Sequence, residues 1–98
     1  MMIEQSAQRV LAAFVFEPND AASWTAVRLS LEDFLYSQWR QGALAGAKPE
    51  DAFAVQVGLG ISMTQADVEA GLMHVILLLA LTRPAEFTLI QLTQQMRV

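Results

Sequence analysis

The chain has 98 residues, of which 54% are hydrophobic and 16% are charged, and its formal net charge is −4. Its six Lys and Arg residues are spread singly along an acidic sequence, so no basic stripe is available for phosphates or anionic lipid, and nucleic acid is a poor partner. The absence of cysteine excludes disulfides and thiolate metal sites. This length indicates a single domain, residues 1–98, and the low charged fraction leaves apolar surface for a partner.

Neither a signal peptide nor a membrane helix is expected. The first residues lack the basic and apolar regions of a secretory signal. The longest apolar run, Leu72 to Leu81, has ten residues and includes His74, whereas a membrane-spanning helix needs about twenty. We therefore expect no membrane insertion.

Two helices are predicted in the first half of the chain. The apolar positions of the first, three and four residues apart, are Ile3, Ala7, Val10, Leu11 and Phe14. Pro18 interrupts this pattern, and Asn19 or Asp20 can cap the next helix through a side-chain oxygen. The apolar face of the second helix comprises Trp24, Val27, Leu31, Phe34, Leu35 and Trp39. Gly42 or Gly46 is expected to end it.

The second half predicts strands. Bulky and small residues alternate from Phe53 to Gly60, as in a strand with one buried face. Thr64 begins a short capped helical turn. The run Leu72–Leu81 is apolar on both faces, as in a central strand covered on two sides, and a third strand is predicted at about Phe87–Thr93. The order predicts an α+β fold, with two N-terminal helices packed on a small antiparallel sheet of about three strands.

Residues that could carry chemistry form no catalytic constellation. His74 is the one histidine of the chain, so the three or four ligands of a zinc site are missing, and a structural or interface role is expected. Glu32-Asp33 and Glu50-Asp51 are adjacent carboxylates that point in different directions. Gly58-Leu59-Gly60 lacks the remaining residues of a phosphate loop and predicts a turn or bulge. We expect no catalytic residue, no enzyme activity, no cofactor and no metal.

Four aromatic residues could be taken for a base-stacking platform. They lie at helical spacing, at Trp24, Phe34, Tyr36 and Trp39. In an acidic chain this spacing favours core positions, and any ring edge left uncovered would suit a protein partner.

Several segments, taken in order, match one family. They are Phe16-Glu17-Pro18-Asn19 ahead of Trp24, Gly42-Ala43-Leu44 followed by Gly46, Asp67 to Gly71, and Arg83-Pro84-Ala85-Glu86-Phe87. From about Ile3 to Met96 the chain resembles the C-terminal domain of phage tail sheath proteins, the family that also supplies sheaths to R-type pyocins and related contractile injection machines. The resemblance implies a structural, prophage-type role, with other sheath subunits and the tail tube protein as partners. The implied location is the virion tail, or the bacterial cytoplasm before assembly.

In that family, terminal arms add strands to the sheets of neighbouring subunits, and the subunits carry a larger N-terminal region than this chain. The resemblance therefore implies that residues 84–98 form a strand-exchanging arm that pairs with its own sheet or a neighbour's. The expected interface residues are Phe87, Thr88, Leu89, Ile90, Gln91, Leu92 and Thr93. Proline in place of Ile90 is expected to weaken assembly more than it unfolds the helices.

A different class of function uses the same surface. A small adaptor or regulatory domain would bind one protein through the same sheet edge. Self-association that depends on concentration would favour the sheath, and a convergent polar pocket would favour an enzyme instead.

Overall fold

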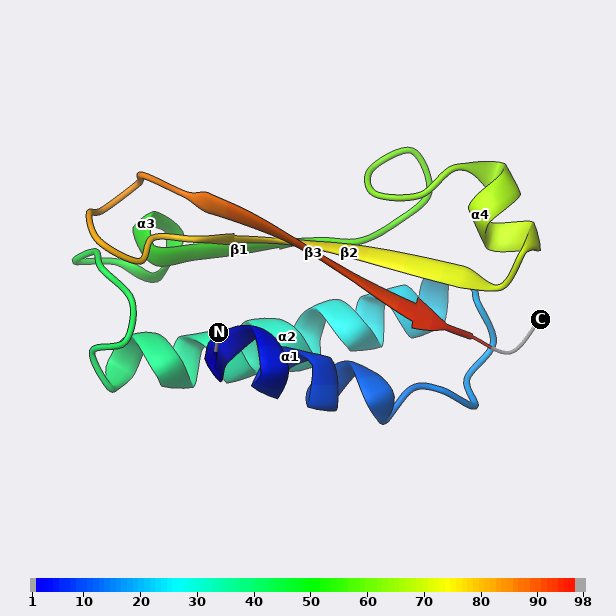
Figure 1. Cartoon of the computed structure of the whole chain (residues 1–98), viewed down its shortest axis with the longest axis horizontal. Helices are drawn as coiled ribbons and strands as arrows, with labels where there is room; N and C mark the ends of the chain where they lie inside the picture. The colour runs from blue at the N-terminus through cyan, green and yellow to red at the C-terminus, as the bar shows by residue number, and fades with distance from the viewer. Residues whose placement is uncertain (1, 97–98) are drawn as a thin grey trace.

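The computed structural model describes residues 2–96 and shows two layers, with two long helices on one face of a three-stranded sheet (Figure 1). The elements are α1 (Met2–Ala12), α2 (Ala21–Arg40), α3 (Pro49–Ala52), β1 (Phe53–Gln56), α4 (Gln65–Glu69), β2 (Leu72–Leu79) and β3 (Thr88–Gln95). The α+β class and the helix-on-sheet arrangement are confirmed. None of the described helices is long and apolar enough to cross a membrane.

The helix α1 buries the stripe that its spacing predicts. Ile3, Ala7 and Leu11 belong to the buried core, and Val10 packs against that core from its margin. Phe14 packs there too, but it lies in the turn after the helix, which ends at Ala12.

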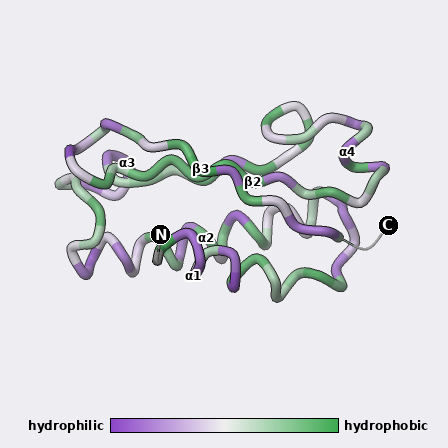
Figure 2. The backbone as a smooth tube through the Cα atoms, viewed as in Figure 1, coloured by the Kyte–Doolittle hydropathy of each residue, from purple (hydrophilic) through white to green (hydrophobic). Residues whose placement is uncertain are grey.

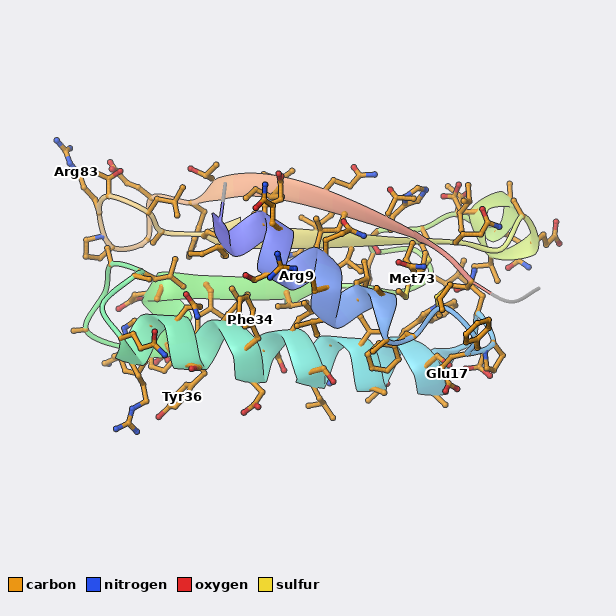
Figure 3. The ribbon with its side chains drawn as sticks, turned by 60° about the horizontal axis from the view of Figure 1, so that its bottom comes forward. Arg9, Glu17, Phe34, Tyr36, Met73 and Arg83 are labelled. Carbon is orange, nitrogen blue, oxygen red and sulfur yellow. The ribbon has the colours of Figure 1, made fainter. Side chains whose placement is uncertain are left out.

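The helix α2 begins where Asp20 caps it, since the Asp20 carboxylate accepts a hydrogen bond from the Ser23 amide at 2.9 Å. Its core residues are Val27, Leu31 and Leu35, flanked by the partly buried Trp24, Phe34 and Trp39. The prediction of a core role was wrong for Tyr36, which is 41% exposed. Figure 3 shows Tyr36 on the side of α2 that faces away from the sheet.

The strand β1 is shorter than the sequence pattern predicted. The alternation runs to Gly60, but the strand ends at Gln56. The amides of Ile61, Ser62 and Met63 all donate to the Gly58 carbonyl, and Gly60 has a φ of 79°, a left-handed conformation that favours glycine. The predicted turn at residues 58–60 is thereby confirmed, and it closes the strand.

The strand β2 is central, as predicted, and pairs antiparallel with both neighbours in the order β1-β2-β3. One face is buried beneath the helices and carries Met73, Val75, Leu77 and Leu79. The opposite face carries Leu72, His74, Ile76 and Leu78, all only partly buried. The prediction of cover on two sides was wrong, because α1 and α2 lie on the same side of the sheet (Figure 1). Figure 2 shows the hydrophobic course of β2 beside the more hydrophilic C-terminal half of β3.

The short helix α4 has the cap that its sequence predicts. The Asp67 amide donates to the Thr64 hydroxyl at 3.2 Å, and the Thr64 amide donates to the Asp67 carboxylate at 2.9 Å. Gly71, with a φ of 75°, ends the segment and leads into β2.

Candidate assembly interface

The strand β3 forms one edge of the sheet, and within residues 2–96 no strand lies on its outer side. Its eight residues pair with β2 in a continuous register from Leu72 opposite Gln95 to Leu79 opposite Thr88. The third strand is thus confirmed, two residues longer at its C-terminal end than the pattern predicted. Here the segment after Pro84 folds back onto its own chain, which is one of the two pairings that the sequence left open.

The register decides which backbone groups of β3 are used inside the chain. The Met96 amide donates to the Gly71 carbonyl at 2.6 Å, so this pair is a hydrogen-bonded one. Hydrogen-bonded and non-hydrogen-bonded pairs alternate along an antiparallel ladder. The residues whose N–H and C=O face β2 are therefore Gln94, Leu92, Ile90 and Thr88. Those whose N–H and C=O point out of the sheet are Gln95, Thr93, Gln91 and Leu89.

Contacts with side chains agree with this alternation. From α1, the Gln8 side-chain amide donates to the outward carbonyl of Thr93 at 3.4 Å. Among the described residues no side chain bonds to the backbone of Leu89 or Gln91. The outer edge of β3 is therefore partly covered at Thr93 and open at Leu89 and Gln91.

The side chains of β3 alternate between the two faces of the sheet. Ile90 and Leu92 are buried toward the helices, whereas Leu89 is 61% exposed on the outer face beside Leu78, its partner in the register. Phe87, just before the strand, is also exposed. The open edge thus adjoins an exposed apolar surface, which is the combination that an added strand can cover.

This geometry changes the role expected of Ile90. Its N–H faces β2 and its side chain is buried, so proline there would remove a hydrogen bond of the chain's own sheet. The register therefore gives no support to the expectation that proline at position 90 would weaken assembly more than it unfolds the chain. Gln91, whose N–H faces outward, is the suitable position for the same experiment. Sequence reasoning also missed Gln95 as an edge residue, because only the register shows which residues point outward.

The segment between β2 and β3, which contains Pro84, is exposed throughout residues 81–87. The Ala85 amide donates to the Asp51 carbonyl at 2.9 Å, and Ala85 has a φ of 60°, which is uncommon for a residue with a side chain. Across the same turn, Arg83 Nε lies 3.9 Å from Glu86 Oε2. Few contacts hold this segment, so a hinge at Pro84 is compatible with the structure.

His74 joins β2 to two neighbours on the outer face of the sheet. Its Nδ1 lies 2.8 Å from the Thr93 hydroxyl on β3, and its Nε2 lies 3.5 Å from the Asp67 carboxylate on α4. The hydrogen bond from the Thr64 amide, and to a smaller extent the proximity of His74, hold the pKa of Asp67 below its ordinary value. His74 therefore has a structural place, as its sequence setting predicted.

The carboxylates remain apart from one another. Glu32 Oε1 accepts from Arg28 at 3.1 Å on the outside of α2, and Glu50 and Asp51 lie in α3. Within residues 2–96 no group of three His, Cys, Asp or Glu side chains could hold a metal ion. The described side chains converge on no catalytic site.

No protein-family model and no curated protein matches the sequence. Solved structures do. A chain in the cryo-EM structure of the anti-feeding prophage baseplate, 6-fold symmetrised, is 42% identical with a TM-score of 0.79, and the match covers 97% of this chain and 26% of that one. A chain of the PVC sheath complex in the contracted state, from an extracellular contractile injection system, is 48% identical with a TM-score of 0.76, covering 94% and 26%. A chain of the anti-feeding prophage helical sheath in the contracted state is 43% identical with a TM-score of 0.71, covering 93% and 26%.

These matches span almost the whole chain, and they agree with the resemblance that its segments carry. The chain is a phage-tail-sheath-like domain. It spans about a quarter of the length of the chains that it matches.

Proposed function

We propose that this chain is a structural domain of a contractile sheath and that it links neighbouring subunits by strand addition at β3. The observation that carries the proposal is the match of 94% of the chain, at 48% identity, to a chain of a contracted sheath complex. The open edge at Leu89 and Gln91 supports it. The partners would be other sheath subunits and the tail tube, with no catalytic role, no nucleic acid and no membrane insertion.

Two arrangements use the same strand. In the first, β3 stays on its own sheet and a neighbour's segment adds to its outer edge, where the N–H and C=O of Leu89 and Gln91 point outward. In the second, residues 84–98 cross to a neighbour through a hinge at Pro84 and make there the hydrogen bonds that β3 makes here. Both arrangements join subunits through backbone hydrogen bonds. The link between subunits would therefore not depend on one set of side-chain contacts when subunits rotate and slide.

The location follows from the same role. A sheath domain would belong to the assembled virion tail or injection machine, and to the bacterial cytoplasm before assembly. The adaptor alternative uses the same sheet edge, but no described contact favours it over assembly.

The test compares three variants of the full sheath gene product that contains this domain. Gln91→Pro removes an outward N–H, Gln91→Thr changes the same side chain and keeps the N–H, and Ile90→Pro removes an N–H that faces β2. We expect Gln91→Pro to give folded subunits that form no tubes in negative-stain microscopy, and Gln91→Thr to form tubes. Tubes from folded Gln91→Pro subunits would overturn addition at this edge.

A second measurement separates the two arrangements. If a segment of a neighbouring subunit adds to β3, the 98-residue chain should bind a synthetic peptide with the sequence of that segment. Gln91→Pro should weaken this binding. If β3 itself is exchanged, the chain should form domain-swapped oligomers, which light scattering detects. A chain that stays monomeric and binds no strand peptide contradicts both.

A further inference from the structure

The two ends of α2 carry different surfaces. At its N-terminal end, the turn between α1 and α2 projects Phe16, whose side chain is 84% exposed, with the exposed Val15 beside it. This turn is ordered by backbone hydrogen bonds, from the Val15 amide to the Ala12 carbonyl and from the Glu17 amide to the Phe14 carbonyl. An aromatic ring held out of the fold in this way leaves a large apolar area in water, and we call the segment 15–17 the knob.

At the C-terminal end of α2 lies an open hollow of about 500 Å³. It is lined by Tyr36, Trp39, Arg40, Gly42, Leu44 and Gly46. The rings of Tyr36 and Trp39 stand 5.5 Å apart at 54°, and the Trp39 indole N–H donates to the Gly46 carbonyl at 2.9 Å. The Trp39 ring is therefore held in place before anything enters the hollow.

The knob and the hollow are complementary in residue type and charge. A phenylalanine ring entering the hollow meets the tilted rings of Tyr36 and Trp39, an arrangement that aromatic groups prefer. Glu17 follows Phe16 directly in the knob, and Arg40 lies in the wall of the hollow. The apolar contact would thus be flanked by an ion pair that fixes its orientation.

The positions of the two surfaces decide the kind of contact. Figure 3 shows Glu17 and Tyr36 at opposite ends of the molecule, whose longest dimension is 39 Å. A chain cannot fill its own hollow, so the occupant comes from another molecule. Contacts between two different surfaces of the same protein repeat head to tail and generate rings or helices.

A second hollow, of about 330 Å³, lies beside the knob and fits less well. It is lined by Phe14, Glu17, Pro18, Asp20, Ala22, Ser23 and Ala26. Two acids and no cation are among these residues, so a docking knob would bring Glu17 of one copy against Glu17 and Asp20 of the other. Charge therefore favours the hollow at the opposite end.

We propose that a second copy of this chain docks head to tail, with its Phe16 in the hollow beside Tyr36 and Trp39 and its Glu17 against Arg40. The contact involves no residue of β3. It is additional to strand addition and does not depend on it.

The test measures self-association of the 98-residue chain by sedimentation velocity, with every variant carrying Gln91→Pro so that addition of a neighbour's segment to the outer edge of β3 is suppressed. In this background the parent should grow beyond a dimer as concentration rises. Phe16→Ser should raise the dissociation constant about tenfold or more. Leu29→Ser is the control, since Leu29 is also an exposed apolar residue, 55% exposed near the middle of α2, and this variant should associate as the parent does.

The charges give an independent readout. Glu17→Arg and Arg40→Glu should each weaken association about two- to fivefold, and the double variant should recover most of the loss. A mixture of Phe16→Ser with Arg40→Glu contains one intact knob and one intact hollow, so it should associate more strongly than either variant alone. Unchanged association of Phe16→Ser, growth that stops at a dimer in the parent, a monomeric parent, or no recovery in the charge-swapped variant would overturn the proposal. Circular dichroism should show all variants folded, because the substituted side chains are exposed and the Gln91 N–H that proline removes points out of the sheet.

Discussion

The two sides of β2 differ in how their hydrogen bonds are completed. On the β1 side the partner strand has four residues, and beyond it the chain supplies side chains instead: Asn19 donates to the Leu72 carbonyl at 3.0 Å, and the Ser62 hydroxyl donates to the His74 carbonyl. On the other side β3 runs along all of β2, and its own outer edge is left open at Leu89 and Gln91. Proteins normally protect sheet edges against pairing.

The same chain thus fills open hydrogen-bonding positions of one strand with side chains and leaves those of another strand unfilled. Two further hydrogen bonds fix the orientation of the Asn19 side chain. Its oxygen accepts from the Trp24 indole N–H at 2.7 Å, and its amide donates to the Val68 carbonyl at 3.4 Å. No comparable side chain meets Leu89 or Gln91 from residues 2–96. Side chains of the chain itself therefore complete β2 beyond the end of β1, whereas the outer edge of β3 is the one that the proposed function assigns to pairing between molecules.

The largest effect should come from the core beneath both edges. Leu31→Ala removes a fully buried side chain of α2 and should lower the free energy of unfolding by about 2–5 kcal/mol. Arg28→Ala, on the outside of the same helix, should cost about 0.5 kcal/mol or less, because its ion pair with Glu32 is exposed. Urea melts of both variants provide the measurement. Similar small losses would show that the helix face is wrongly assigned.

The next effect separates the inner and outer backbone groups of β3. Ile90→Pro should leave the Leu77 carbonyl opposite without its donor, at a cost of about 1–3 kcal/mol in addition to lost packing. Gln91→Pro should cost clearly less, since its N–H faces solvent. The two melting curves, compared with that of Gln91→Thr, test the register directly. Equal destabilisation by the two prolines would contradict the alternation.

The β1 side of β2, where Asn19 donates to the Leu72 carbonyl, can be tested in the same way. Asn19→Ala removes partners from the Leu72 carbonyl and the Trp24 indole, and should destabilise the chain by about 1–3 kcal/mol. It should leave assembly through β3 intact once temperature is lowered enough to keep the chain folded. If instead Asn19→Ala is as stable as the parent chain, the closure of this side has no energetic role.

The smallest effect concerns pH. The pKa of Asp67 is lowered in the folded chain, mainly by the Thr64 amide, so its contribution to stability is present above the pKa of the unfolded chain. This contribution is lost as the pH falls through the folded-state pKa, below about pH 4. The difference in melting temperature between the parent and Asp67→Asn should therefore shrink from pH 6 to pH 3. A constant difference would mean that the helix cap does not depend on the carboxylate charge.

His74 and Glu32 serve as controls for the structural role. His74→Leu and Glu32→Gln should leave assembly largely intact if the fold survives, because neither side chain belongs to a catalytic group. Loss of biological function in either variant, with folding and assembly unchanged, would overturn the structural role. Tube formation and circular dichroism together decide the point.

Local rules in the sequence determined most of the elements. Caps and turns act over a few residues, so they can be predicted without knowledge of the fold. Examples are the cap at Asp20, the capping box of Thr64 and Asp67, and the glycines at 60 and 71. The apolar spacing likewise assigned the buried faces of α1 and α2. The pattern from Phe53 to Gly60 predicted too long a strand. Bulky and small residues continue to alternate through a glycine-rich turn, where the backbone conformation and not the alternation decides the structure.

Only the tertiary structure decided which face of β2 is covered and which groups of β3 point outward. A run such as Leu72 to Leu81 reports burial, but it contains no information on whether a second layer exists, because that depends on where distant helices pack. The direction of each N–H on β3 depends on a register set across the chain by the pairing of Gly71 with Met96. For the same reason the sequence indicated an interface strand, while the fold was needed to distinguish Gln91 from Ile90.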